Sequence, residues 1–188
     1  PTVSYFTLTL ASMEEIKPFT YSVRFNTINN LDVFVKKSFK ELVIDSLINL
    51  KKDFGVSVYG YLLMSDHISL ILSAEDQRQL TMFCEKFKKE VSQKVMDLLE
   101  GDGLTEKRWL LFLVNFINKE NSEGGANKIW TLEYFLKPLN DTIEFDEELL
   151  TLYQRPVEEG IVNNPEDYFY SSVKETLVEQ YYFNKQAV

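Results

Sequence analysis

Apolar and polar residues alternate in two stretches of the first half of the chain. Residues 19–27 read FTYSVRFNT, and residues 56–73 read VSVYGYLLMSDHISLILS. Alternation combined with many β-branched and aromatic residues is typical of strands. Ser65 and Asp66 interrupt the second stretch with turn-forming residues. We therefore predict one strand over 19–27 and a hairpin whose strands cover 56–64 and 67–73.

The hydrophobic period lengthens to that of a helix in other parts of the chain. Apolar residues there recur every three or four positions, with lysines on the opposite side. Gly55 and Gly101 lie where two of these helices should end. The predicted helices cover residues 36–52, 75–99, 105–118 and 146–153. The last of them should stop at Pro156, and a further helix-like segment should begin at Pro165.

The remaining stretches complete the predicted architecture. Residues 121–127 (NSEGGAN) have the composition of an exposed loop, and residues 129–138 fit a strand, an extended segment or a short helix. The aromatic tail after Gln180 is expected to be a docking or dimer element. The order of elements predicts an α+β fold of the ferredoxin-like (split βαβ) type. We expect one domain over residues 1–188, with an antiparallel sheet, helices on one face and additional C-terminal helices.

The net charge of −9 is distributed unevenly along the chain. Residues 1–140 contain 17 Lys+Arg and 18 Asp+Glu, whereas residues 141–188 contain 3 Lys+Arg and 11 Asp+Glu. A nucleic-acid-binding domain usually presents a basic face. Such a face is therefore expected only in the first three-quarters of the chain, because the last quarter repels phosphate.

Composition also narrows the class of protein. The single cysteine, Cys84, excludes an internal disulfide and a cysteine-based metal cluster. No apolar run is long enough to span a bilayer. The first residues lack the basic region and sustained apolar core of a signal peptide. A cytoplasmic location is the simplest interpretation.

Three passages of the chain resemble one family. They are YSVRFNT (residues 21–27), YGYLLMSDHISLIL (59–72) and LYQRPVEEGIVNNPEDYFYSS (152–172). In this order they are similar to passages of the single-tyrosine HUH transposases of bacterial insertion sequences, in the IS-two-hundred-like, REP-associated branch. The third passage is the most specific, because several of its residues keep the family's relative spacing: Pro156, Val157, Gly160, Val162, Pro165, Ser171 and Ser172. The resemblance covers about residues 19–173 and leaves 174–188 as a tail.

The resemblance implies a particular chemistry. In the family, two histidines separated by one residue lie on the same face of a strand and hold a divalent cation, Mg or Mn. The cation polarises the scissile phosphate of single-stranded DNA, and a helical tyrosine attacks it to form a covalent phosphotyrosine. Members recognise a DNA hairpin beside the cleavage site and are commonly dimers. A single-stranded or hairpin DNA partner and a homodimer are therefore expected here.

The family's functional positions are only partly conserved in this chain. The first histidine corresponds to His67, but the second falls at Ser69, a poor metal ligand. The nucleophilic tyrosine falls at Thr151, and the polar helper four residues later falls at Arg155, whose charge disfavours a cation. Tyr153 is a candidate substitute, but it lies about 200° around a helix from Thr151. The resemblance therefore implies a degenerate site that uses a metal only if the protein is active.

Two groups of side chains are candidates for DNA contact. The lysines on the two long predicted helices could hold phosphates, although such residues more often form a solvated face. The main candidates are Lys36, Lys37, Lys40, Lys86, Lys88 and Lys89, and Lys51, Lys52 and Lys94 extend the two sets. Aromatic residues of the predicted strands could stack on bases, or pack in the core: Tyr21, Phe25, Tyr59 and Tyr61.

Three interpretations of function remain open at this point. The first is a transposase-like DNA-binding protein that has lost its strand-cleaving chemistry. The second is an active metal-dependent transposase that uses a displaced tyrosine such as Tyr153. The third is a repurposed protein-interaction module with no nucleic-acid role. The position of Tyr153 relative to His67 and the distribution of basic side chains should distinguish them.

Overall fold

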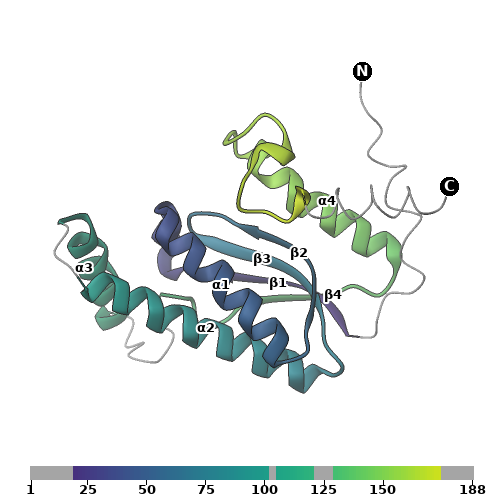
Figure 1. The fold of residues 1–188 in the computed structure, drawn as a ribbon, viewed down its shortest axis with the longest axis horizontal. Coiled ribbons are helices and arrows are strands. Elements are labelled where there is room, and N and C mark those ends of the chain that lie inside the picture. The colour runs from purple at the N-terminus through teal and green to yellow at the C-terminus, as the bar shows by residue number, and fades with distance from the viewer. Residues whose placement is uncertain (1–18, 102–104, 121–128, 175–188) are drawn as a thin grey trace.

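The structure is a computed structural model that describes residues 19–101, 105–120 and 129–174. The predicted loop at 121–127 and the aromatic tail after Gln180 lie outside the described residues. The described chain forms a four-stranded sheet with helices on both of its faces (Figure 1).

The sheet has the strand order β2-β3-β1-β4, and every neighbouring pair is antiparallel. The strands are β1 (Thr20–Asn26), β2 (Ser57–Leu63), β3 (His67–Ser73) and β4 (Phe135–Pro138). This order places β1 and β2 on either side of β3, as in a split βαβ unit. The predicted α+β fold with an antiparallel sheet is therefore confirmed, and the ambiguous segment 129–138 ends in a short edge strand.

Helices α1 (Lys37–Asp53) and α2 (Gln77–Glu100) cover one face of the sheet. The N-terminus of α2 is capped by Asp76, whose carboxylate accepts a hydrogen bond from the Gln79 amide at 2.7 Å. After α1, Gly55 adopts φ 64°, which ends the helix and turns the chain into β2. The apolar stripes of α1 and α2 pack on the strand residues that face these helices. The members of this core include Val23, Phe25, Ile68, Leu70, Leu72, Phe83 and Phe87.

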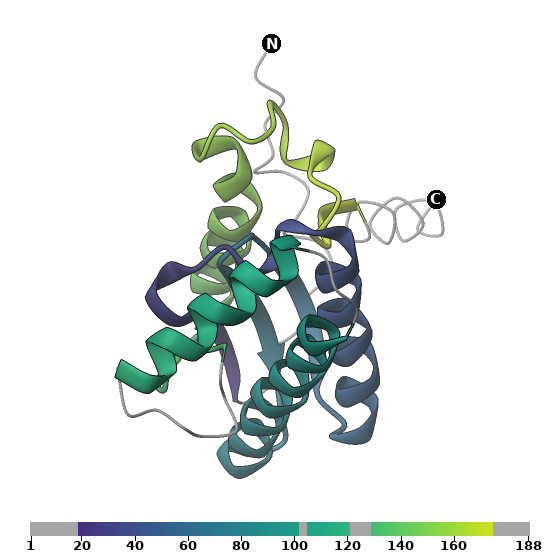
Figure 2. The same cartoon turned by 90° about the vertical axis from the view of Figure 1, so that its left-hand side faces the viewer.

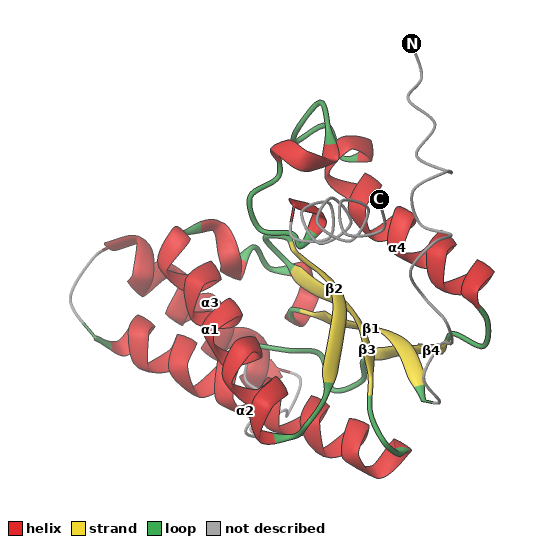
Figure 3. Ribbon diagram, turned by 45° about the vertical axis from the view of Figure 1, so that its right-hand side comes forward, coloured by secondary structure: helices red, strands yellow, loops and turns green. Residues whose placement is uncertain are grey.

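Helix α4 (Thr142–Glu158) covers the opposite face of the sheet (Figure 3). Asp141 caps it by accepting from the Glu144 amide at 2.8 Å, so the helix begins before the predicted residue 146. The prediction that the helix stops at Pro156 is wrong. Pro156 is buried inside the last turn, where its missing N–H removes one helical hydrogen bond and its carbonyl accepts from Ile161 at 2.9 Å.

Helix α3 (Thr105–Glu120) packs against α2, and Figure 2 views the molecule from the side on which α3 lies. Val114 is buried, but three aromatic side chains remain exposed: Trp109 by 62%, Phe112 by 56% and Phe116 by 48%. Neighbouring rings of this set stack at 5.7 and 6.0 Å. None of the helices in the described ranges has the length and apolar character needed to cross a membrane.

Short 3₁₀ turns complete the described chain: η2 (Ile28–Asn30), η3 (Val33–Val35) and η4 (Pro165–Asp167). The last of them occupies the start of the helix-like segment predicted from Pro165. Beyond η4, the chain pairs with the outer edge of β2. The Leu63 amide donates to the Tyr170 carbonyl at 2.9 Å, and the Ser172 amide donates to the Tyr61 carbonyl at 3.0 Å. Part of this sheet edge is thus covered by the C-terminal segment.

Candidate functional site

A polar cluster lies on the face of the sheet that α4 covers. Side chains alternate between the two faces along a strand. On β1 and β3, the residues between those of the apolar core are mostly polar, and they include Ser22, Arg24, His67, Ser69 and Ser73. This face contains two of the positions that the resemblance singles out, His67 and Ser69.

His67 begins β3 and is 5% exposed. Its Nδ1 lies 2.7 Å from Oδ1 of Asp66, and because an ionised carboxylate only accepts, this pairing places the hydrogen on Nδ1. The Nε2 atom is buried without a hydrogen-bond partner among the described residues. Burial lowers the pKa of His67; Asp66 opposes the shift, and the positive charges of Arg24 and Arg155 add to it.

The hydroxyl of Ser69, at the position of the family's second histidine, is hydrogen-bonded to an arginine. Arg24 pairs with Ser69 across β1 and β3, and its Nε donates to the Ser69 hydroxyl at 3.1 Å. Burial is the main cause that lowers the pKa of Arg24, followed by the charge of Arg155, although the guanidinium stays protonated.

The residues present do not fit a divalent cation. His67 and Ser69 offer one imidazole and one hydroxyl, and the Ser69 hydroxyl already accepts a hydrogen bond from the positively charged Arg24. Within the part of the chain that the structure describes, no group of three or more His, Cys, Asp or Glu side chains could hold a metal ion. Cys84 contributes nothing, since it is buried in the other face and burial raises the pKa of its thiol to about 12.

Arg155 reaches the cluster from α4. Two turns before it, about 10 Å along the helix, Glu148 accepts hydrogen bonds from Ser22 and Lys137, each at 2.8 Å. These contacts fix α4 over β1 and direct the same helical face, which carries Arg155, toward Arg24. The Nε atom of Arg155 is buried and has no hydrogen-bond partner within the described residues.

Neither candidate nucleophile faces this cluster. Thr151 is exposed, and its hydroxyl donates to the Glu147 carbonyl at 2.8 Å. Tyr153 is buried, and its Oη lies 2.9 Å from the Ser172 hydroxyl, above Gly60 of β2. Gly60 pairs with Ile71, which is four residues along β3 from His67. At about 3.3 Å per residue, Tyr153 therefore packs roughly 13 Å along the strand from the histidine.

The structure corrects the assignment of Lys88 to the DNA-contact set. Lys88 is 3% exposed, and its ammonium donates to the carbonyls of Thr131 and Leu132 at 2.8 and 2.7 Å. A charge that is buried and hydrogen-bonded in this way cannot contact a phosphate. The neighbouring Lys86 and Lys89 are exposed, as predicted for a solvated helix face.

The other candidate lysines differ in exposure and in their side-chain partners. Lys37 is exposed and forms an ion pair with Glu41, and Lys36 precedes α1 at its N-cap. Lys40 is half-buried: it donates to the Tyr168 hydroxyl at 3.1 Å, and burial lowers its pKa. Lys94 donates to Ser46 and Glu90.

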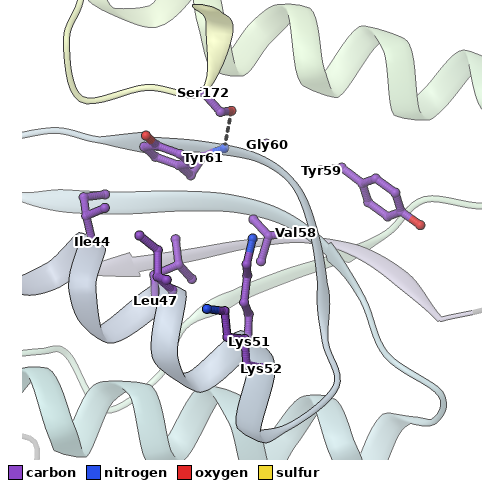
Figure 4. A pocket seen from close by; sticks show the side chains of 10 residues that line it. Ile44, Leu47, Lys51, Lys52, Val58, Tyr59, Gly60, Tyr61 and Ser172 are labelled. Carbon is purple, nitrogen blue, oxygen red and sulfur yellow. Dashed lines mark hydrogen bonds between the residues drawn. The ribbon is translucent and has the colours of Figure 1, made fainter. Parts of the chain in front are cut away.

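A groove of about 350 Å³ runs between α1 and the edge strand β2 (Figure 4). Lys51 and Lys52 project into it from α1, and Tyr61 lines it from β2. At its rim the Ser172 hydroxyl accepts from the Tyr61 amide at 2.9 Å. Of the other aromatic candidates, Phe25 is buried in the core and is removed from the base-stacking set.

Arg24 was not predicted from the sequence to be part of the site. The sequence did contain a sign of its role, because Arg24 is the one charged residue in the alternating stretch 19–27. A single charge in a strand can also lie at an exposed edge, and only the order of strands places β1 between β3 and β4.

No family model and no curated protein matches the chain. Among solved structures, the fold is similar to a REP-associated tyrosine transposase bound to a REP hairpin, with a TM-score of 0.60 and 15% sequence identity. The match covers 86% of this chain and 80% of that one. A putative transposase from Deinococcus radiodurans matches with a TM-score of 0.43 and 14% identity, over 72% of this chain and 90% of that one. The chain therefore has a transposase-like fold.

Proposed function

We propose that this protein is a transposase-like DNA-binding protein that does not cleave DNA strands. The observation that carries the proposal is the hydrogen bond from Arg24 to Ser69, because it holds a positive charge beside the position of the expected second metal ligand. The similarity to a transposase whose structure contains a DNA hairpin supports the choice of DNA as the partner. No divalent metal is required by such a function.

Basic side chains on the α1 side of β2 support a path for a DNA strand. Lys51 and Lys52 could hold phosphates, and Tyr61 lies beside them in the groove. The acidic side chains of the C-terminal quarter, by contrast, would repel the phosphates and do not contribute to this path. We expect DNA affinity to depend on this groove more than on Lys86 and Lys89 of α2.

Binding of single-stranded and hairpin DNA tests the proposal. The wild type should bind with an affinity that falls as salt rises and does not change when EDTA replaces Mg²⁺. The variant Lys51→Gln/Lys52→Gln should bind more weakly, and the matched variant Lys86→Gln/Lys89→Gln should change affinity less. Absence of salt-sensitive binding to any DNA would contradict the proposal.

An active transposase is the main rival, and the position of Tyr153 argues against it. A nucleophile must come within a few Å of the scissile phosphate, whereas Tyr153 is buried beside Ser172 and away from His67. Incubation of hairpin-flanked single strands with Mg²⁺ or Mn²⁺ should yield no covalent protein–DNA adduct. An adduct that disappears in Tyr153→Phe would establish the rival.

A protein-interaction module is a second candidate, favoured by the exposed aromatic stripe of α3. Trp109, Phe112 and Phe116 form a contiguous apolar surface of the kind that marks protein interfaces. The homodimer implied by the resemblance would be a natural use of it. Light scattering of the wild type and of Trp109→Ser/Phe112→Ser tests this: dimers of the first and monomers of the second are expected.

A further inference from the structure

Two positively charged groups are held close together under α4. Arg24 projects from β1 and is fixed by Ser69, while Arg155 projects from α4 and lies near enough for its charge to lower the pKa of Arg24. Like charges in a partly buried site repel each other, and an uncompensated buried charge is strongly destabilising. The pair therefore requires negative charge, either from the protein or from a ligand.

The carboxylates nearby do not contact the pair directly. Glu148 and Asp66 already accept hydrogen bonds from other side chains, and Glu159 influences Arg24 through its charge. None of the ion pairs within the described ranges includes Arg24 or Arg155. The guanidinium groups thus keep donors available for an added anion.

Two buried nitrogen atoms define what this anion must offer. Arg155 Nε can only donate a hydrogen bond, and it has no acceptor among the described residues. His67 Nε2 accepts when Nδ1 donates to Asp66, and it has no donor there. Water would satisfy both atoms but would bring no charge. A ligand that also balances the two guanidinium groups needs anionic oxygens and one acidic hydrogen.

We propose that Arg24, Arg155 and His67 form a metal-independent binding site for a phosphate monoester, such as the terminal phosphate of a DNA strand. The second ionisable hydrogen of a phosphate monoester can be shared between a phosphate oxygen and His67 Nε2. As this hydrogen moves to the imidazole, the charge on the phosphate approaches about −2, which matches two guanidinium groups. Its planar oxygen pairs suit guanidinium donors. A phosphodiester carries a single charge and no hydrogen. The choice of DNA as the source of the phosphate rests on the proposed function, whereas the site rests on these contacts.

Fluorescence anisotropy with a short oligothymidylate in EDTA tests the site. Separate strands carry a phosphate at the 5′ end, a phosphate at the 3′ end, or hydroxyls at both ends. The wild type should bind either the 5′- or the 3′-phosphorylated strand about tenfold more tightly than the hydroxyl-ended strand. A factor of this size corresponds to about one charged hydrogen bond. Arg24→Gln and Arg155→Gln should remove this difference. Lys89→Gln, on the other face of the sheet, should keep it.

A conservative variant distinguishes a loss of phosphate binding from a loss of the fold. Arg155→Lys keeps the charge but loses the planar fork of donors, so it should keep only part of the preference for a phosphorylated end. Equal affinity of the wild type for all three strands would overturn this inference and leave the proposed DNA binding intact. A full preference in folded Arg155→Gln would also overturn it.

Inorganic phosphate separates the two proposals if no strand binds. In that case the proposed function fails, and the site is judged by the melting temperature in millimolar phosphate against chloride of equal ionic strength. A rise in the wild type that is absent in Arg155→Gln supports the site. Equal rises, or none, overturn it.

Discussion

The two faces of the sheet are built from the same strands but serve different purposes. On the face toward α1 and α2, residues such as Val23, Leu70 and Phe87 form a dry core in which aromatic rings pack on one another. On the face toward α4, an apolar cluster that includes Leu62 of β2 and Ile71 of β3 lies beside charged groups such as Arg24 of β1 and Glu148 of α4. Stability is concentrated on the first face, so the second is free to carry chemistry.

The two faces also treat buried charge differently. On the α2 side, the Lys88 ammonium is surrounded by carbonyl oxygens. Under α4, Arg155 and His67 each retain a buried nitrogen without a hydrogen-bond partner in the described chain. A buried polar group without a partner costs free energy unless a ligand or water completes it. This contrast separates a charge whose hydrogen bonds are completed within the fold from groups whose hydrogen bonds are not.

The largest effect is expected in the dry core. Phe87→Ala should lower the free energy of unfolding by about 3–5 kcal/mol, because Phe87 is fully buried, with its ring centroid 5.5 Å from that of Phe25. Urea unfolding measures the change. The same substitution at exposed Phe112 of α3 is the control and should cost less than about 1 kcal/mol. Equal losses at both positions would break the contrast.

Lys88 should produce the next largest effect. Lys88→Met should lower the free energy of unfolding by about 2–3 kcal/mol, because it removes the charged donor from the carbonyls of Thr131 and Leu132. DNA affinity should stay within about twofold of the wild type. Lys89→Met is the matched control and should leave stability nearly unchanged. A loss of DNA binding in folded Lys88→Met would return this residue to the contact set.

Gly60 tests how closely α4 packs on β2. An alanine Cβ at this position would lie 2.7 Å from Cδ1 of Leu149, so Gly60→Ala should cost about 1–3 kcal/mol through overpacking. A double-mutant cycle with Leu149→Ala checks the cause, because the cost of Gly60→Ala should shrink when the clashing side chain is removed. Additive losses would show that α4 does not contact Gly60 in this way.

The smallest effect should come from Glu148. Burial alone would raise its pKa, but hydrogen bonds from Lys137 and Ser22 hold the pKa below its ordinary value. A carboxyl whose pKa is lowered by folding contributes stability above its unfolded pKa, and this contribution is lost as pH falls through the folded pKa. Glu148→Gln should therefore cost less than about 1 kcal/mol at neutral pH. Urea unfolding over a pH series should show this difference vanishing in acid; a constant difference would contradict the assignment.

The fold was largely predictable because periodicity is a local property. The alternation at 67–73 and the helical stripe from 75 to 99 correspond to β3 and α2. Pro156 was misjudged because its effect depends on position: near the end of α4 a proline removes little and can be packed in the core. The packing of α4 on the second face of the sheet depends on long-range contacts, which the hydrophobic period of the helix does not specify.

The site was less predictable because it depends on long-range contacts. His67 and Ser69 were singled out by the family resemblance, and their descent from a metal site stays a prediction. Lys88 could not be separated from Lys86 and Lys89, because the carbonyls that bind its ammonium lie more than forty residues away. The partnership of Arg24 with Arg155 likewise joins β1 to α4.

The pairing of residues 170–172 with β2 affects how strongly separate copies of this chain associate. A bare strand edge offers free amides and carbonyls that recruit strands from other molecules. Along Tyr61–Leu63 the C-terminal segment already occupies those groups. A chain cut before residue 170 would lose the buried side chain of Val173 and expose a template for intermolecular strand addition. Its defect would appear as concentration-dependent aggregation, together with a lower melting temperature of each single molecule.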